Sequence, residues 1–128
     1  YTLSNAGKFI EEKGCIPEEV KKQVDLLFVK DGLYHVFEIK SFKRNPRSRI
    51  RDGIAQLLEY SFINKKNIFN NKKYVLHLLF SKEINEGLVK YPYIIGFLDS
   101  LNINLCFMQN KKIVWHKDFR KNDPFFIN

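Results

Sequence analysis

Runs of apolar residues, some alternating with polar ones, predict where the strands of this chain lie. Residues 23–30 (QVDLLFVK) and 33–41 (LYHVFEIKS) read as two strands rich in branched and aromatic side chains. Between them, Asp31-Gly32 favours a two-residue hairpin turn, a turn that needs positive φ at both positions. We therefore expect these two segments to form an antiparallel hairpin.

Helical spacing predicts three helices. The first covers residues 4–13 and ends at Gly14. The second covers residues 48–63, and its apolar positions fall on one core-facing stripe: Ile50, Ile54, Leu57 and Leu58. The third covers residues 82–100, and Pro92 is expected to break it into two.

The remaining apolar segments complete a mixed sheet. Residues 74–80 (YVLHLLF) form a nearly continuous apolar run, typical of a strand that is buried on both faces. Residues 103–108 and 111–116 are predicted to be a closing pair of strands around Gln109-Asn110. The order of elements predicts one α/β domain over residues 1–128, with a mixed β-sheet flanked by helices.

Composition and charge indicate which partners to expect. The 22 Lys and Arg residues outnumber the 14 Asp and Glu residues, which gives a net charge of +8. This surplus favours a nucleic acid as partner, although the codon usage of an AT-rich genome would also enrich Lys. No segment has the length or hydropathy of a membrane span, and no signal peptide is present, so we expect no membrane partner and a cytoplasmic location. The first residue is Tyr, which leaves open a longer parent protein, and a homodimer is also open.

The hairpin brings two carboxylates together. A two-residue turn at Asp31-Gly32 places Asp25 directly opposite Glu38, with Cβ atoms roughly 5 Å apart. Lys40 lies two residues beyond Glu38 and therefore projects from the same face. Opposed carboxylates destabilise a strand pair, but a magnesium ion between them would reverse the sign of that interaction. The alternative is a charge cluster on an exposed sheet face.

The segment VDLLFVKDGLYHVFEIKS resembles the core of the PD-(D/E)xK nucleases. Asp25 matches the first acid and Glu38-Ile39-Lys40 matches the (D/E)xK element, while Val24 stands where the motif name has Pro. QLLEY, from Gln56 to Tyr60, matches the QxxxY element that often follows in this family. The resemblance covers roughly Ser4 to His116 and implies a restriction-endonuclease-like core.

The resemblance also implies roles for individual residues. Asp25, Glu38, Lys40, Gln56 and Tyr60 are the expected catalytic residues. The expected metal ligands for Mg²⁺ or Mn²⁺ are Asp25, Glu38, the backbone carbonyl of Ile39 and one acid of the first helix, either Glu11 or Glu12, with Glu18 and Glu19 as further candidates. The alternative for each of these glutamates is a charge that faces solvent.

Basic residues cluster directly after the acidic motif. They are Lys43, Arg44, Arg47, Arg49 and Arg51, and we expect them to contact phosphates of the nucleic acid, unless the segment is simply a solvated loop. On the second helix, Gln56 and Tyr60 share one flank with Arg49 and Gly53. Because Gly53 has no Cβ, we expect another backbone, of protein or nucleic acid, to approach closely there.

These patterns together predict a metal-dependent endonuclease. A metal-activated water would hydrolyse the phosphodiester bonds of DNA, with Lys40 orienting the water or stabilising the transition state. The resemblance points to restriction, phage defence or DNA recombination as the setting. Three alternatives remain: a Holliday-junction resolvase, an RNase or toxin nuclease that cuts RNA, and a non-catalytic module that binds nucleic acid.

Overall fold

The computed structural model of the chain describes residues 2–18, 24–41, 46–65 and 73–126. Five strands form one sheet in the order β1-β2-β3-β4-β5: β1 (Leu26–Lys30), β2 (Leu33–Lys40), β3 (Tyr74–Phe80), β4 (Ile103–Gln109) and β5 (Lys112–Trp115). The outer pairs β1–β2 and β4–β5 are antiparallel, whereas β2–β3 and β3–β4 are parallel. The predicted α/β class with a mixed sheet flanked by helices is therefore confirmed.

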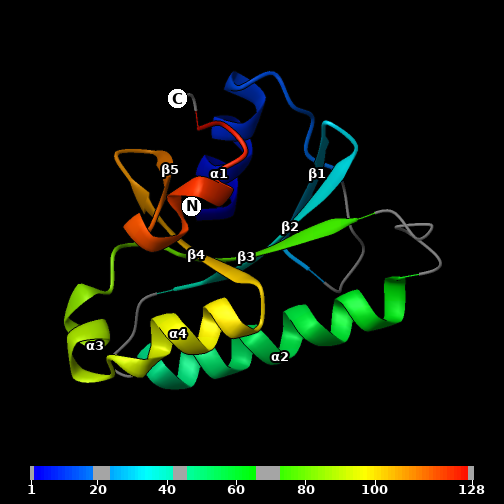
Figure 1. Ribbon diagram of the computed structural model, residues 1–128. Helices are drawn as coiled ribbons and strands as arrows, with labels where there is room; N and C mark the ends of the chain where they lie inside the picture. Colours follow the sequence, from blue (N-terminus) through cyan, green and yellow to red (C-terminus); the bar gives the residue numbers. More distant parts are fainter. Residues whose placement is uncertain (1, 19–23, 42–45, 66–72, 127–128) are drawn as a thin grey trace.

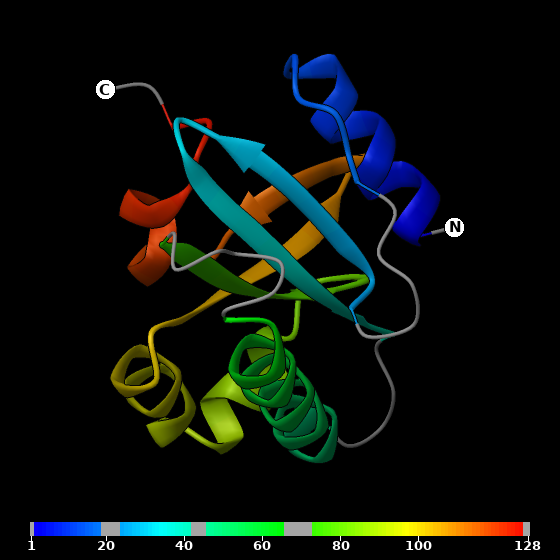
Figure 2. The same ribbon diagram turned by 90° about the vertical axis from the view of Figure 1, so that its right-hand side faces the viewer.

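Helices cover both faces of this sheet (Figures 1 and 2). Three of them lie on one face: α2 (Pro46–Asn64), α3 (Asn85–Lys90) and α4 (Tyr93–Ser100). On the other face lie α1 (Thr2–Glu12) and the 3-10 helix η1 (Lys117–Asn122). Within the described residues, none of the helices combines the length and apolarity that a bilayer span requires.

The β1–β2 hairpin has the predicted register. Asp31 and Gly32 both adopt positive φ, 53° and 78°, and Leu27 pairs with Val36. The paired register ends at Leu26 and Phe37. Beyond it, the Asp25 amide donates to the carbonyl of Phe37 over 3.2 Å, one residue out of step with that pairing. Since side chains alternate between faces, Glu38 projects to the same face as Leu78, the face that α2 covers.

Several predicted boundaries were wrong. α2 begins at Pro46, two residues before the predicted start, in keeping with the fixed φ of proline, which suits the first turn of a helix. The last hairpin turns at Asn110-Lys111, both with positive φ, one residue later than predicted. The helix predicted over 82–100 is split into α3 and α4 next to Pro92, as expected from that residue, whereas η1 was not predicted.

Gly53 has a different role from the one expected. It is buried where α2 packs on β3, and a Cβ at this position would lie 2.4 Å from the Cδ1 atom of Leu78. The close neighbour is therefore a side chain of the protein's own sheet, not an external backbone. Because Leu78 pairs with Glu38 across β2 and β3, Gly53 sets how closely α2 approaches the sheet beside the acidic pair.

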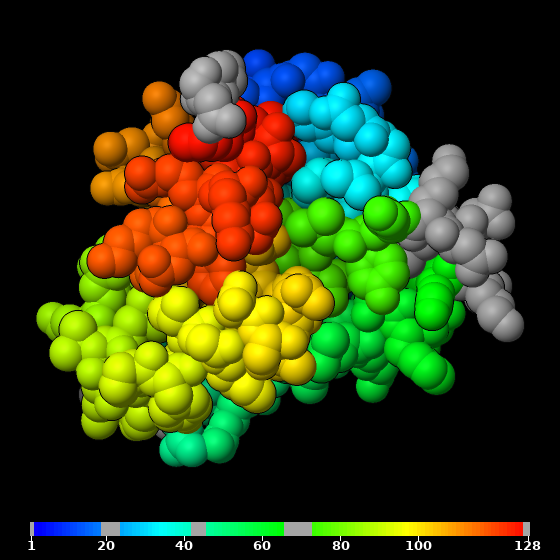
Figure 3. All heavy atoms as spheres, in the orientation of Figure 1, coloured from blue at the N-terminus to red at the C-terminus, as the bar shows by residue number. Residues whose placement is uncertain are grey.

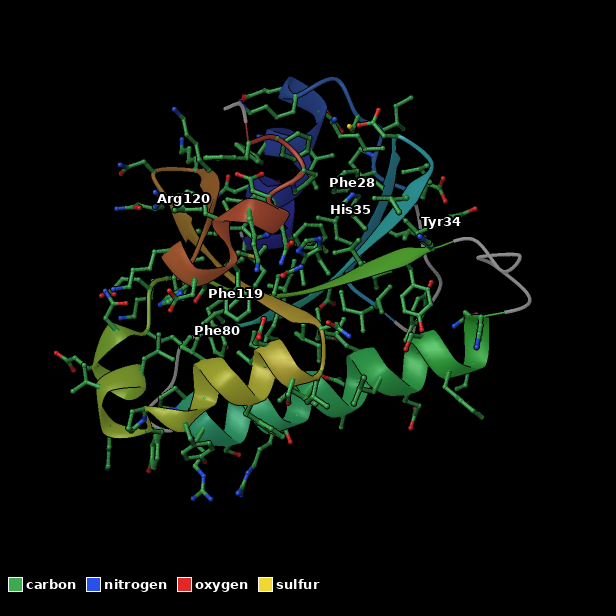
Figure 4. All side chains as sticks on the ribbon, in the orientation of Figure 1. Phe28, Tyr34, His35, Phe80, Phe119 and Arg120 are labelled. Atoms are coloured by element: carbon green, nitrogen blue, oxygen red, sulfur yellow. The ribbon has the colours of Figure 1, made fainter. Side chains whose placement is uncertain are left out.

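The opposite face of the sheet contains a chain of buried polar side chains. Trp115 Nε1 donates to His77 Nδ1 over 3.1 Å, and His77 Nε2 lies 2.9 Å from His35 Nδ1. Because an indole N–H can only donate, the proton of His77 must sit on Nε2 and be donated to His35. Burial lowers the pKa of His77 well below its usual value, so the pair is neutral. Figure 4 shows His35 beside Phe28, whose ring stacks on it.

Replacement of Gly53 by Val should weaken the packing of α2 on the sheet. The added side chain overlaps Leu78, and overpacking of this kind costs about 1–3 kcal/mol in the free energy of unfolding. Chemical denaturation would measure the loss. In a Leu78→Val background, which removes the two overlapping Cδ atoms, the same substitution should cost less; an equal cost in both backgrounds would show that the contact is not responsible.

Candidate active site

Asp25 is held in place by β2 just before β1 begins. Its backbone amide donates to the carbonyl of Phe37, and its Oδ2 atom accepts the amide of Ile39 over 2.8 Å. These two hydrogen bonds straddle Glu38, so the Asp25 carboxylate is fixed beside the Glu38 side chain. One carboxylate oxygen of Asp25, Oδ1, is not used by the Ile39 amide.

Glu38 is a buried carboxyl group in an apolar setting. Its side chain is 4% exposed, and Leu78 is its neighbour on β3. Burial raises the pKa of Glu38 to about 8, with further contributions from a hydrogen bond to Asp25 and from the negative charge of Asp25. The two carboxyl groups therefore lie within hydrogen-bonding distance of each other, as the sequence predicted.

Lys40 completes the (D/E)xK element at the end of β2. It is half-buried, and its carbonyl accepts the amide of Ser81 over 3.0 Å, which fixes the strand end. Its positive charge opposes the rise in the pKa of Glu38. Among the described ion pairs none joins Lys40 to either acid, so the ammonium group lies close enough to act on Glu38 through space without neutralising it.

Gln56 and Tyr60 lie on α2, the helix that packs on β2 and β3. Gln56 is exposed, whereas Tyr60 is buried with its ring against the sheet. Burial raises the pKa of the Tyr60 hydroxyl, and the negative charge of Glu18 raises it further. Both residues thus lie on the helix that covers the Asp25–Glu38 face.

The upstream acids are divided between the two faces of the sheet. Glu11 and Glu12 are exposed on α1, which lies on the face opposite α2, and the structure does not bring either of them to Asp25 and Glu38. Glu18 pairs through its backbone with Leu27 of β1, and its charge reaches Tyr60. Glu19 lies outside the described residues. The sequence around Glu18 has no strand-like pattern, so this bridge could not have been predicted from it.

In the described part of the chain, no group of three or more acidic, histidine or cysteine side chains is arranged to hold a metal ion. The donor set near the end of β2 is therefore two carboxylates, with the carbonyl of Ile39 beside them. Cys15 and Cys106 are both free.

The described arginines of the basic cluster do not share one side of α2. At about 100° per residue, Arg49 shares the flank of α2 that carries Gln56, while Arg47 and Arg51 point to the far side, toward α4. Arg47 Nε donates to Tyr93 Oη over 2.9 Å, which fixes it against α4. Lys43 and Arg44 lie outside the described residues. Of the described arginines, only Arg49 is on the side of the carboxylate pair.

Comparison with known proteins supports the fold. No family model and no curated protein matches the sequence. Among solved structures, an XisH family protein from Nostoc punctiforme PCC 73102 superposes with a TM-score of 0.70 at 12% identity, covering 89% of this chain and 97% of that one. SfsA of Pyrococcus furiosus in complex with Ca²⁺ gives a TM-score of 0.45 at 15% identity, over 86% of this chain and 59% of that one. The XisH family protein therefore shares the α/β fold of this chain along nearly its whole length.

The ionisation of Glu38 should make the metal-free protein less stable as pH rises. Its pKa is about 8 in the folded chain against an ordinary value of 4.5, so between these values the folded state holds the proton more tightly than the unfolded state. The free energy of unfolding should therefore fall as pH rises through this window, by a few kcal/mol. Denaturation in EDTA would measure it.

Glu38→Gln provides the comparison for this pH dependence. The amide keeps the size of the side chain but cannot ionise. The free energy of unfolding of the variant should therefore fall much less with rising pH, and the variant should be the more stable protein above pH 8. Parallel curves for the two proteins would mean that Glu38 is not the titrating group.

Proposed function

We propose that this chain is a metal-dependent nuclease that hydrolyses phosphodiester bonds of DNA, with Asp25, Glu38 and Lys40 at its catalytic centre. One observation carries the proposal: the buried Glu38 carboxyl meets Asp25 at the end of β2, next to a lysine whose charge acts on it. A carboxyl pair in this setting is unfavourable for folding unless a cation shares it. The shared fold of the XisH family protein and the resemblance to PD-(D/E)xK nucleases are consistent with it.

The donor set fits a divalent cation such as Mg²⁺ or Mn²⁺. Magnesium is commonly held by one or two carboxylates, with water and substrate phosphate oxygens in its remaining positions. Asp25 and Glu38 would supply the carboxylate oxygens, and the Ile39 carbonyl would be a further oxygen ligand. When bound, the ion would make water more acidic and offset the charge that develops on the phosphorus centre.

The side chains around the pair would orient the reactants. The Ile39 amide keeps the Asp25 carboxylate in one orientation, which removes the entropy loss of ordering it on substrate binding. The Lys40 ammonium would orient the attacking water and stabilise negative charge on the phosphate oxygens in the transition state. Gln56 and Tyr60 would position the substrate phosphate or Lys40 from α2.

The positive charge of the chain favours a polyanionic substrate. Its net charge of +8 attracts nucleic acid at long range, and Arg49 lies on the α2 flank nearest the carboxylates. We propose DNA as the substrate. RNA is the competing substrate, since the same carboxylates would serve either backbone, and the cleavage assay separates the two.

Cleavage of supercoiled plasmid tests the activity. With Mg²⁺ or Mn²⁺ the chain should nick or linearise the plasmid, and EDTA should abolish this. Lys40→Ala should lower the rate by roughly 100-fold or more, because it removes the charge that acts in the transition state. A structured RNA should be cut more slowly than DNA.

Lys112→Ala is a matched control for this experiment. Lys112 is exposed on β5, at the opposite edge of the sheet, and its loss changes the net charge equally. If Lys112→Ala and Lys40→Ala reduce cleavage alike, the effect belongs to the overall charge. If the chain binds DNA but cuts neither nucleic acid, the non-catalytic binding module becomes the better description.

A divalent ion should stabilise the folded chain through the acidic pair. Ion at about 100-fold excess over its Kd adds about 2.7 kcal/mol to the free energy of unfolding, which thermal unfolding with and without Mn²⁺ would detect. Asp25→Asn and Glu38→Gln should each remove the gain. Asp99→Asn, at an exposed acid on α4, should keep it, and an undiminished gain in all three variants would place the ion elsewhere.

A further inference from the structure

The outward side of α2 carries apolar residues that the fold does not use. Ala55, Leu58 and Phe62 fall at spacings of three and four residues, so they form one row along the helix together with Arg51. Phe62 is 84% exposed and Leu58 is 38% exposed. The core-facing side of α2 is buried separately, so this row is a second apolar stripe, directed to solvent.

A groove runs beside this row, between α2 and α4. Its volume is about 480 Å³, and its walls are mainly apolar: Ile50, Ile54 and Leu58 from α2, with Tyr93, Ile94 and Phe97 from α4. Figure 3 shows α4 (yellow) on the surface next to α2 (green). Arg47 and Arg51 are the charged residues that line it, and the hydrogen bond from Arg47 to Tyr93 ties the two helices together.

Two opposite charges on this side of α2 lie symmetrically about Ala55. Arg51 lies four residues before it and Glu59 four residues after it, and the three face the same way. Within the described residues, no ion pair occupies Arg51 or Glu59. A helix with one positive and one negative group at equal distances from a small residue is complementary to its own antiparallel copy.

We propose that α2 binds α2 of a second copy of this chain, antiparallel and with the two-fold axis at Ala55. Arg51 then faces Glu59 of the partner subunit, and the same contact occurs twice by symmetry. The small side chain of Ala55 lets the helices approach closely at the centre. Leu58 and Phe62 reach into the α2–α4 groove of the partner subunit, which buries the exposed apolar row.

Charge complementarity favours a second copy over another occupant of the groove. A nucleic acid would meet apolar walls instead of a run of cations, and its phosphates would lie beside Glu59. The pairing surface also lies away from the flank that carries Gln56, so the dimer does not cover the exposed Asp25 beside Glu38. The proposal therefore stands independently of the nuclease activity.

Exchange of the two charges tests this pairing. Sedimentation of the full chain over a wide range of concentrations should show a dimer. Arg51→Glu alone places acid against acid at both contacts, and Glu59→Arg alone places base against base, so each should weaken the dimer by roughly tenfold or more. The double variant R51E/E59R should restore it.

Mixing the two single variants makes the result specific. In a mixed pair every contact again joins an acid to a base, so a heterodimer should form from two chains that do not pair with themselves. Phe62→Ser should also dissociate the dimer, whereas Glu11→Arg, on α1, should not. Thermal unfolding would verify that the variants are folded.

Three outcomes would overturn the proposal. One is a native chain that stays monomeric at every concentration, and another is a dimer that both single variants retain. The third is a monomer that binds a single-stranded oligonucleotide and loses it on Phe62→Ser, which would assign the groove to nucleic acid.

Discussion

The turn at Asp31-Gly32 is the constraint on which the candidate site depends. Two residues with positive φ close the β1–β2 hairpin, and this fixes the pairs from Lys30–Leu33 to Leu26–Phe37, so that Asp25 lies directly beyond the last pair. A register shifted by one residue would send Asp25 to the opposite face of the sheet, away from Glu38. The parallel pairing of β2 with β3 places Leu78 next to Glu38, and the Leu78 side chain lies on the face of the sheet that α2 covers. A local turn thus determines which groups meet some distance along the strands.

The acidic pair works against the stability of the metal-free fold. Burial of Glu38 among apolar neighbours disfavours its charge, and the adjacent Asp25 disfavours it further, so the carboxyl holds its proton near neutral pH. Folding retains this arrangement because the surrounding strands and α2 fix it from several sides. Unfavourable polar groups held by a rigid scaffold are typical of functional sites, since the binding of a ligand can relieve them.

Local features of the structure could be predicted well from the sequence. Features that depend on how the helices pack on the sheet could be predicted less well. The hairpin register followed from two turn residues, and it brought Asp25 and Glu38 together as expected. Whether Glu11 or Glu12 could join them depended on which face α1 covers, and no local pattern encodes that. At Gly53 the sequence predicted the close approach of another backbone, because it does not show that the Leu78 side chain fills this space.

The arginines show a different limit. The helix predicted over residues 48–63 already separates Arg49 from Arg51 by helical geometry. Arg47 precedes that predicted helix, and its side is fixed only because α2 begins at Pro46. The position of the helix start therefore decides on which side of α2 Arg47 lies.

The buried chain from Trp115 through His77 to His35 has a consequence for how the strands assemble. These three residues come from β5, β3 and β2, so each of the two hydrogen bonds between them joins different strands. If β3 slipped by one residue along β2, an aliphatic side chain would replace His77 and leave the indole N–H and the His35 ring unsatisfied in an apolar layer. Aliphatic contacts tolerate such a slip, but a directional donor and acceptor do not. The hydrogen-bonded chain therefore favours a single alignment of the central strands. It contributes to the uniqueness of the fold more than to its stability.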